Sequence, residues 1–477
     1  MKFSDQIYLT LSSQRYTPYN LAKKLNAIAI LESASFTKGR QRYSILMIKK
    51  AFTIVQEKDD IEFVVEGEKI PYGKINPVDY RTRNPDILDA LDYVASQNPD
   101  AKTISGNDIP LPGSGIGFLS YEFARHCDNI KFQPQEDELN IPESEFVVGH
   151  IYIVFDHFTE QLHIFALNYK EHKIDLEKEV ENLKKKLNDM DFSYIQEENE
   201  TYEHEIITDE AKSKAEYIAK IEALKKHIID GDIIQAVPSR RLQIKSEMSA
   251  KEFYGRLRKV NPSPYLFLID FEKYQLVGSS PESLIRVRQG VAQINPIAGT
   301  IRRGKSEAED EMLKQQLSSD PKERAEHLML VDLARNDLGR VSVKNSVTVP
   351  QFMECEPFSH LIHLVSHVEG KLRDGVKPIQ ALRFAMPAGT VSGAPKISAM
   401  QILSGLEKTK RNFYAGALGY VQSNGDLDFC ITLRSALYKD SIWNLQAGSG
   451  IVYDSNAERE FTETCEKLGA LYDVLTK

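Results

Sequence analysis

The chain lacks the features that mark membrane, secreted and zinc-binding proteins. It contains no run of about 18 apolar residues, and its N-terminal stretch is too polar for the apolar region of a signal peptide. Its four cysteines, at positions 127, 355, 430 and 465, are far apart and form no C-x-x-C pair. This spacing argues against a zinc site or a disulfide framework and fits a reducing compartment. We therefore expect a cytoplasmic protein with no membrane segment.

Acidic residues outnumber basic ones, and the usual nucleotide-binding loops are lacking. The formal net charge is -9, and basic and aromatic residues are not interleaved, so a nucleic-acid-binding role is disfavoured. The glycines of LPGSGIG (111–117) do not follow the G-x-G-x-x-G pattern of dinucleotide loops. In MPAGTVSGAPK (386–396), three residues instead of four separate Gly389 from Gly393, and Lys396 follows Ala-Pro, which excludes a Walker A loop.

The pattern of apolar residues predicts an α+β protein with antiparallel sheet, because runs of strands are interrupted by helices. Hairpins are predicted at 150–167 and 416–438, and amphipathic helices at 174–190, 214–230 and 456–475. The polar, acidic stretch 191–210 is the best candidate for a linker. It divides the chain into an N-terminal segment, 1–200, and a C-terminal segment, 201–477.

A helix predicted at 320–340 carries the first candidate site residue. Asp320 can cap this helix, and Pro321 suits its first turn. Glu326 shares a side of the helix with Met329 and Leu330. A carboxylate beside apolar residues is either half-buried and paired or held there to bind something, whereas an isolated Glu is most often a surface residue.

Glu463 offers a possible partner for Glu326. Glu463 lies four residues before Lys467 on the last predicted helix, so one possibility is that these two side chains simply form an ion pair on the surface. Alternatively, Glu463 and Glu326 are two carboxylates around one Mg²⁺, which typically takes one or two protein carboxylates plus water and substrate.

Three further side chains and one turn are candidates for a site. Arg434 is the single charge in an apolar stretch predicted as a strand, and a buried Arg needs an anion. Glu282 could act as a general acid if a dry site raises its pKa. His363 lies in an apolar strand, where a structural role is the more common one. The turn Gly448–Gly450 could bind an anion through backbone N–H groups.

Taken together, these motifs resemble the chorismate-utilising enzymes, and within that family the large, synthase subunits of anthranilate synthases. The matching motifs cover residues 214–477 almost without gaps: GDIIQ (231–235), NPSPY (261–265), SPES (280–283), PIAGT (296–300), KERAEHLMLVDLARNDLGRV (322–341), HLIHLVS (360–366), PAGTVSGAPK (387–396), FYAGALGY (413–420), DLDFCITLRSA (426–436), AGSGIVYDS (447–455) and ETCEK (463–467). The N-terminal segment matches more loosely, through LES (31–33), GRQRYSIL (39–46) and SGIGFLSYE (114–122).

The resemblance implies a fold of two packed antiparallel sheets with helices on the outside. It also implies Mg²⁺-dependent amination of chorismate at C2, loss of the C4 hydroxyl and elimination of pyruvate to give anthranilate, the first step of tryptophan biosynthesis. By resemblance, Glu326 and Glu463 hold Mg²⁺, Glu282 protonates the departing hydroxyl, and His363 lies beside the reacting ring. The implied substrate-binding residues are Gly299, Thr300, Thr390, Tyr414, Arg434, Gly448, Ser449 and Gly450.

Two positions separate the possible products. Relatives that add water to chorismate carry Lys where this chain has Gln235, and relatives that make 4-amino-4-deoxychorismate often carry a nucleophilic Lys where it has Ala298. Both positions favour anthranilate, and 4-amino-4-deoxychorismate is the alternative product. A regulatory subunit without catalysis is disfavoured because the residues expected to act as the acid, the metal ligands and the substrate-binding Arg are all present: Glu282, Glu326, Glu463 and Arg434.

The resemblance also implies two partners. None of the cysteines lies in a G-x-C-x-G motif, so ammonia is expected from glutamine by way of a separate amidotransferase subunit, component II. Tryptophan is expected to inhibit the enzyme by binding Ser33, Pro264, Tyr265 and Leu266. Leu266 stands where the family more often has Met.

Overall fold

The structure is a computed structural model that describes residues 4–35, 39–40, 42–77, 83–189, 191, 201–357 and 361–477. Its strands pair antiparallel in two sheets that share the long strands β5 (Tyr43–Glu57) and β9 (Ser144–Asp156). The register between β5 and β9 shifts three times between Met47 and Phe52. Such irregularities bend strands, and here they let both strands continue from one sheet into the other.

The first sheet contains β5, β9 and strands from both ends of the chain. Its order, read from the strand pairings, is β11-β13-β25-β24-β15-β14-β2-β5-β9-β10-β1. The remaining bounds are β11 (His204–Ile206), β13 (Ser239–Ser246), β25 (Ile442–Gly448), β24 (Ser435–Lys439), β15 (Gln275–Ser280), β14 (Tyr265–Asp270), β2 (Ala29–Glu32), β10 (Gln161–Leu167) and β1 (Gln6–Ser12).

The second sheet continues from the other ends of β5 and β9. Its order is β7-β6-β5-β9-β8-β22-β23-β16-β17-β20, and β18 and β19 also pair with β20. The bounds are β7 (Glu68–Pro71), β6 (Asp60–Val65), β8 (Gly115–Leu119), β22 (Ala417–Val421), β23 (Leu427–Ile431), β16 (Ser283–Arg288), β17 (Val291–Ile294), β18 (Ile297–Arg302), β19 (Thr348–Pro357) and β20 (Leu361–Lys371). Two short pairs, β3 (Ala34–Ser35) with β4 (Gly39–Arg40) and β12 (Gln235–Ala236) with β21 (Gly393–Ala394), lie apart.

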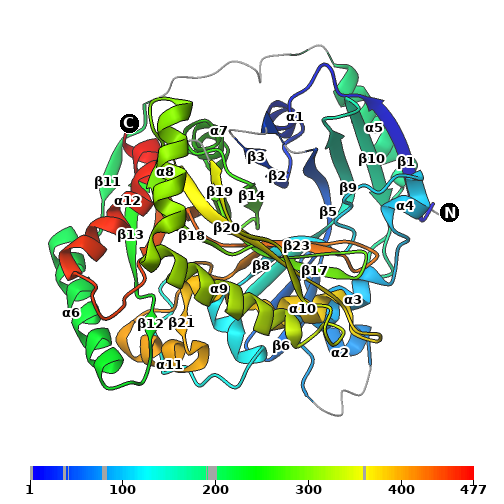
Figure 1. The fold of residues 1–477 in the computed structure, drawn as a ribbon. Coiled ribbons are helices and arrows are strands. Elements are labelled where there is room, and N and C mark those ends of the chain that lie inside the picture. Colours follow the sequence, from blue (N-terminus) through cyan, green and yellow to red (C-terminus); the bar gives the residue numbers. More distant parts are fainter. Residues whose placement is uncertain are drawn as a thin grey trace.

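Helices cover the outer faces of the sheets (Figure 1). The first sheet buries apolar side chains against α1 (Pro18–Leu25), α5 (Leu176–Asn188), α7 (Ala250–Val260) and α12 (Ala457–Thr476). Leu176, Val180, Leu183 and Leu187 of α5 recur at helical spacing and are all buried, so this stripe holds α5 on the sheet.

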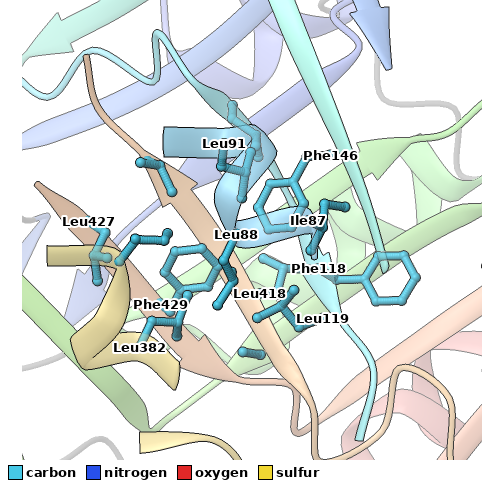
Figure 2. Close-up of a cluster of buried hydrophobic side chains, with 14 of the residues drawn as sticks. Ile87, Leu88, Leu91, Phe118, Leu119, Phe146, Leu382, Leu418, Leu427 and Phe429 are labelled. Carbon is cyan, nitrogen blue, oxygen red and sulfur yellow. The ribbon is translucent and has the colours of Figure 1, made fainter. Parts of the chain in front are cut away.

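The second sheet packs against α3 (Ile87–Ala95) and α10 (Pro378–Ala385). Figure 2 shows Ile87, Leu88 and Leu91 of α3 beside Phe118 and Phe146 of the sheet. The predicted α+β fold of two packed antiparallel sheets with outer helices is confirmed. The other helices are α2 (Tyr72–Ile75), α4 (Ala101–Ser105), α6 (Glu210–Ile229), α8 (Glu307–Ser319), α9 (Pro321–Gly339), α11 (Lys396–Leu406) and the 3₁₀ helices η1 (Tyr121–His126) and η3 (Gly389–Val391).

The predicted linker, 191–210, is partly structured. Residues 204–206 form β11, Glu210 begins α6, and residues 192–200 lie outside the described part of the chain. Strands of the two predicted segments pair directly, β2 with β14 and β8 with β22. The division at residue 200 therefore stays a prediction. No helix among the described residues is both long and apolar enough to cross a membrane.

A buried ion pair fixes the loops that border the site described below. Arg411 and Glu407 are both buried, with Nε and Oε2 2.7 Å apart. The Arg411 guanidinium also donates to the carbonyl oxygens of Val237 and Val391. Because a guanidinium is planar and its donors are fixed, this one side chain holds three segments in register.

Candidate active site

The structure brings most of the predicted site residues into one cavity of about 560 Å³, called here the main cavity. The predicted residues that line it are Glu282, Gly299, Glu326, His363, Thr390, Tyr414, Arg434, Gly448, Gly450 and Glu463. They come from positions up to 181 residues apart (282 to 463), so only the fold places them together. Cavities of this size are typical of small-molecule sites.

Four carboxylates line the main cavity, two from α9 and two from α12. Asp320 caps α9 as predicted, accepting from the N–H groups of Lys322 and Glu323. Glu326 lines the cavity with Met329 and Leu330, so the predicted shared side of the helix is confirmed. Glu323 is the second α9 carboxylate in the cavity.

The α12 carboxylates are Glu460 and Glu463. Lys467 Nζ lies 2.8 Å from Glu463 Oε1, so the predicted i,i+4 ion pair exists inside the cavity instead of on a free surface. Sequence reasoning missed Glu323 and Glu460. The detectable signal is E-x-x-E, which occurs once in α9 and twice in α12 and places both carboxylates of a pair on one helix face.

This carboxylate cluster, Glu323, Glu326, Glu460 and Glu463, is short of positive charge. Burial raises the pKa of Glu326, Lys322 lowers it, and Glu463 and Glu460 raise it further. Oε2 of Glu460 is buried and has no hydrogen-bond partner. A bound cation would satisfy this oxygen and relieve the repulsion, so the donor set fits a hard, oxygen-ligated ion. In the described ranges, no group of three or more His, Cys, Asp or Glu side chains forms a ready-made metal site, and Mg²⁺ requires only one or two carboxylates.

Glu282 lies on the wall of the main cavity between β15 and β16. Its backbone carbonyl accepts from the N–H of Ile431, which fixes the turn beside β23. Burial raises the pKa of the Glu282 carboxyl to about 7, although the hydrogen bond from Thr390 and the charges of Lys467 and Arg434 act in the opposite direction. Thr390 Oγ1 donates to Glu282 Oε1 over 3.0 Å. A carboxylic acid that is partly protonated near neutral pH is suited to general acid catalysis.

Arg434 differs from its predicted setting in one respect. The predicted strand is interrupted there: Arg434 lies between β23 and β24 and has the left-handed φ of 47°. A left-handed backbone conformation is strained in residues other than glycine, and such strained residues recur at functional sites. Among the described residues, no carboxylate lies within 4.0 Å of the Arg434 guanidinium. This cation therefore remains available for an anion in the main cavity.

Tyr414 lies beside this cation and next to the chain at Gly448. A Cβ at Gly448 would lie 2.4 Å from the Pro238 carbonyl oxygen and 3.2 Å from the Tyr414 hydroxyl oxygen. Only glycine allows this close approach. Burial raises the pKa of Tyr414 to about 12, so its hydroxyl stays a hydrogen-bond donor.

The predicted backbone nest at Gly448–Gly450 is only partly directed at the cavity. Gly448 and Gly450 line it, but Ser449 does not: its N–H donates to the Tyr217 hydroxyl over 3.1 Å, and its Oγ lies 2.8 Å from the same oxygen. Tyr217 belongs to α6 and is far from Ser449 in the sequence, so no local pattern predicts the orientation of the Ser449 side chain.

His363 and the β18 strand form another wall of the main cavity. The ladder between β18 and β20 is irregular at Gly299, whose φ is +72°, and Thr300 pairs with His363 across it. Burial lowers the pKa of His363, a hydrogen bond with the Gly299 backbone raises it, and Arg434 lowers it, so the net shift favours the neutral imidazole. The side chain of Thr300 lies outside what the structure describes. Gln235 and Ala298, which distinguish the possible reactions, also line the cavity.

The four residues predicted to bind an inhibitor also come together. Ser33, Pro264, Tyr265 and Leu266 line a separate cavity of about 300 Å³ between the two sheets, called here the second cavity. Oγ of Ser33 is buried without a partner. Apolar residues such as Ile45 and Leu418 share the cavity with paired charges, among them Arg286 and Asp428, whose Nη2 and Oδ2 are 2.7 Å apart. Pro264 lines both this cavity and the main cavity.

Comparisons with known proteins identify the family of this chain. The family model of chorismate binding enzymes matches residues 37–473. Anthranilate synthase component 1 of Spirochaeta aurantia is 45% identical over 98% of this chain and 94% of its own, and that of Bacillus subtilis is 36% identical over 98% and 91%. The crystal structure of anthranilate synthase component I from Streptococcus pneumoniae matches with a TM-score of 0.78 and 35% identity, covering 90% of this chain and 92% of its own. The menaquinone-specific isochorismate synthase of Escherichia coli, at 16% identity and a TM-score of 0.70 over 99% and 95% of the two chains, shares the fold. The chain belongs to the chorismate-binding enzyme family.

Proposed function

We propose that this chain converts chorismate and ammonia to anthranilate, pyruvate and water, with Mg²⁺ bound in the main cavity. One observation carries the proposal: a single cavity holds an Arg with no carboxylate partner, a carboxylate cluster suited to a cation, and a carboxylic acid with a pKa of about 7. Chorismate requires these three features, because it has two carboxylates and a hydroxyl that must leave.

The two ends of chorismate would be held by different parts of the cavity. Arg434 and the Tyr414 hydroxyl would bind one carboxylate, and the charge of Arg434 makes it the stronger of the two contacts. Glu326 and Glu463 would hold Mg²⁺, whose charge would bind the ring carboxylate and offset its repulsion from the carboxylate cluster. Fixing both ends orients the ring without any covalent bond.

The reaction then depends on Glu282 as a proton donor and on two residues, Gln235 and Ala298, that cannot support the alternative reactions. Glu282 would give its proton to the C4 hydroxyl, which leaves as water while ammonia attacks C2. His363, being neutral, would contact the ring without adding positive charge. Gln235 cannot act as a base toward water, and Ala298 cannot form an adduct, so both favour amination at C2.

Ammonia would come from a separate glutamine amidotransferase. The relatives are named component 1, which implies a second component. Burial raises the pKa of Cys127 to about 12 and raises that of Cys430 further, so neither thiol is an activated nucleophile.

Tryptophan would bind in the second cavity as a feedback inhibitor. Replacing Ser33 with Leu fills the space beside its partnerless hydroxyl, and we expect the concentration of tryptophan for half-inhibition to rise at least about 10-fold, because roughly 1.4 kcal/mol of binding is lost. Anthranilate formation at increasing tryptophan measures this. Leu266→Met, which keeps side-chain volume, is the matched control and should retain inhibition. Unchanged inhibition in Ser33→Leu would place the inhibitor elsewhere.

The proposed reaction is tested by supplying chorismate, Mg²⁺ and ammonium without a partner. Anthranilate and pyruvate should appear in equal amounts, and EDTA should abolish both. Consumption of chorismate without pyruvate would instead indicate 4-amino-4-deoxychorismate. If chorismate is not consumed even with an amidotransferase subunit present, the proposal is wrong.

A further inference from the structure

A small cavity of about 40 Å³ lies directly behind Glu282 and is called here the rear cavity. It shares Leu330, Glu282 and Thr390 with the main cavity, so these residues form the partition between the two. The rear cavity is far too small for chorismate. It exceeds the volume of about 30 Å³ that one water molecule occupies in the liquid.

One face of α9 forms a wall of the rear cavity. Leu330, Leu333, Ala334 and Asp337 follow the i, i+3, i+4, i+7 spacing of a single helical stripe, and all four line the cavity. The same helix therefore presents its N-terminal carboxylates to the main cavity and Asp337 to the rear cavity. Opposite α9, the segment at Gly389 packs so closely that a Cβ there would lie 1.8 Å from Leu333 Cδ2.

The polar groups of the rear cavity are those that a water molecule needs. Oδ1 of Asn295 is buried and has no hydrogen-bond partner. Asp337, which is only 7% exposed, lines the cavity together with Glu282 and Thr390. Buried waters occupy cavities that offer two to four polar partners, and a buried carbonyl oxygen is costly when left unpaired.

Asp337 is held in place by a charge outside the main cavity. Lys396 Nζ lies 3.2 Å from Asp337 Oδ2 and 3.5 Å from Oδ1, and both side chains are nearly buried. Lys396, the last residue of MPAGTVSGAPK, does not belong to a Walker A loop, and this contact gives it a structural role. Neither Asp337 nor Lys396 lines the main cavity, so neither is placed to touch chorismate.

We propose that the rear cavity binds water and that Asp337 is a positioning residue that returns a proton through this water to Glu282 after each turnover. The inference rests on the proposed function, in which Glu282 gives its proton to the departing C4 hydroxyl. The Glu282 carboxylate then accepts a proton from the cavity water, that water accepts one from Asp337, and Asp337 regains one from solvent. The ammonium group formed at C2 releases one proton to solvent, so no net proton is consumed.

The charges around both carboxyl groups are compatible with this path. Burial raises the pKa of Asp337, while Lys396 and Arg340 lower it and Asp128 raises it. On the other side of the water, Lys467 and Arg434 act on Glu282 from the main cavity. Burial thus shifts the pKa of both carboxyls in the same direction, above the ordinary value.

The first test replaces Asp337 with Asn, which keeps the shape and removes the proton. We expect kcat for ammonia-dependent anthranilate formation to fall about 10-fold, with the KM for chorismate changed less than about 2-fold, because reprotonation of Glu282 becomes limiting. A small buffer acid that reaches Glu282 through the main cavity should restore kcat in proportion to its concentration. The wild-type rate should not depend on the buffer concentration.

A second variant fills the rear cavity and leaves both carboxyls intact. Ala334→Val adds volume at a residue that lines it, and should show the same loss of kcat and the same rescue by buffer acid. Ala90→Val is the matched control, because Ala90 is equally buried, in α3, and lines none of the cavities described here. It should leave the buffer dependence unchanged. If Asp337→Asn does not fold, the loss of kcat and the rescue by buffer acid in Ala334→Val test the relay without it.

The outcomes separate the relay from the reaction itself. If Glu282→Gln retains full activity, Glu282 is not the acid, and both proposals fail at that step. If Glu282→Gln is inactive but Asp337→Asn and Ala334→Val show no rescue by buffer acid, the relay is wrong and the proposed reaction stands. On the Glu282→Gln background, Asp337→Asn should cost nothing further, because two residues that act as a unit are not additive.

Discussion

Glu282→Gln is expected to lower kcat by about 10²–10⁴-fold and to remove the alkaline limb of the pH profile. With the wild type, activity should fall as the pH rises through the pKa of Glu282, about 7, because only the protonated carboxyl can donate to the C4 hydroxyl. The pH profile of kcat/KM reports the pKa of Glu282 in the free enzyme, and the profile of kcat reports its pKa in the complex with substrate. The alkaline limb of the kcat profile should lie at higher pH, because the negative charge of bound chorismate disfavours the Glu282 carboxylate and so raises its pKa. Free ammonia must be held constant while the pH is varied.

A second buried carboxyl provides the control for this experiment. Burial raises the pKa of Glu145 to about 7, as for Glu282, but Glu145 is bonded to the Tyr274 hydroxyl and lines neither the main nor the second cavity. Glu145→Gln should keep the alkaline limb. Thr390→Val should move the limb to higher pH, because the Thr390 hydroxyl stabilises the Glu282 carboxylate. An alkaline limb that persists in Glu282→Gln would assign it to another group.

Much of the site was predictable because its residues lie on elements with strong local signals. The capping of α9 by Asp320 fixes which face of that helix Glu326 occupies, and the cap of α12 at Asn456 does the same for Glu463. Once two helices and their faces are known, a carboxylate among apolar neighbours predicts a binding role. The packing of the two helices around one cavity was implied only by family resemblance.

The features that sequence reasoning missed depend on contacts between distant segments. The orientation of Ser449 is set by Tyr217, 232 residues earlier in the chain. The left-handed backbone of Arg434 interrupts an apolar run that local periodicity predicts as one strand. Asp337 looks like an ordinary helix carboxylate until β17, α10 and η3 close the rear cavity against α9. No local pattern encodes such contacts.

Replacing Glu326 or Glu463 with Gln is expected to abolish the response to Mg²⁺ while leaving the fold intact. A ligand removed from a catalytic metal site costs several kcal/mol of transition-state stabilisation, so we expect anthranilate formation to fall about 10³-fold. Binding provides a readout independent of activity. At about 100 times its Kd, Mg²⁺ should stabilise the wild type by about 2.7 kcal/mol, and should stabilise either variant much less.

The opposite sign is expected for Glu326→Gln in EDTA. Because Glu463 and Glu460 raise the pKa of Glu326, the metal-free cluster is repulsive at this residue, and Glu326→Gln should leave stability unchanged or increase it by a few tenths of a kcal/mol. Glu466→Gln, on the same helix but paired with Arg459 outside the cavity, is the matched control and should keep the full response to Mg²⁺. A Glu326→Gln protein that loses activity, remains stabilised by Mg²⁺ and is destabilised in EDTA would show that Glu326 supports the fold instead of the metal. A carboxylate cluster that weakens the metal-free protein yet is required with Mg²⁺ is the expected signature of residues arranged for catalysis.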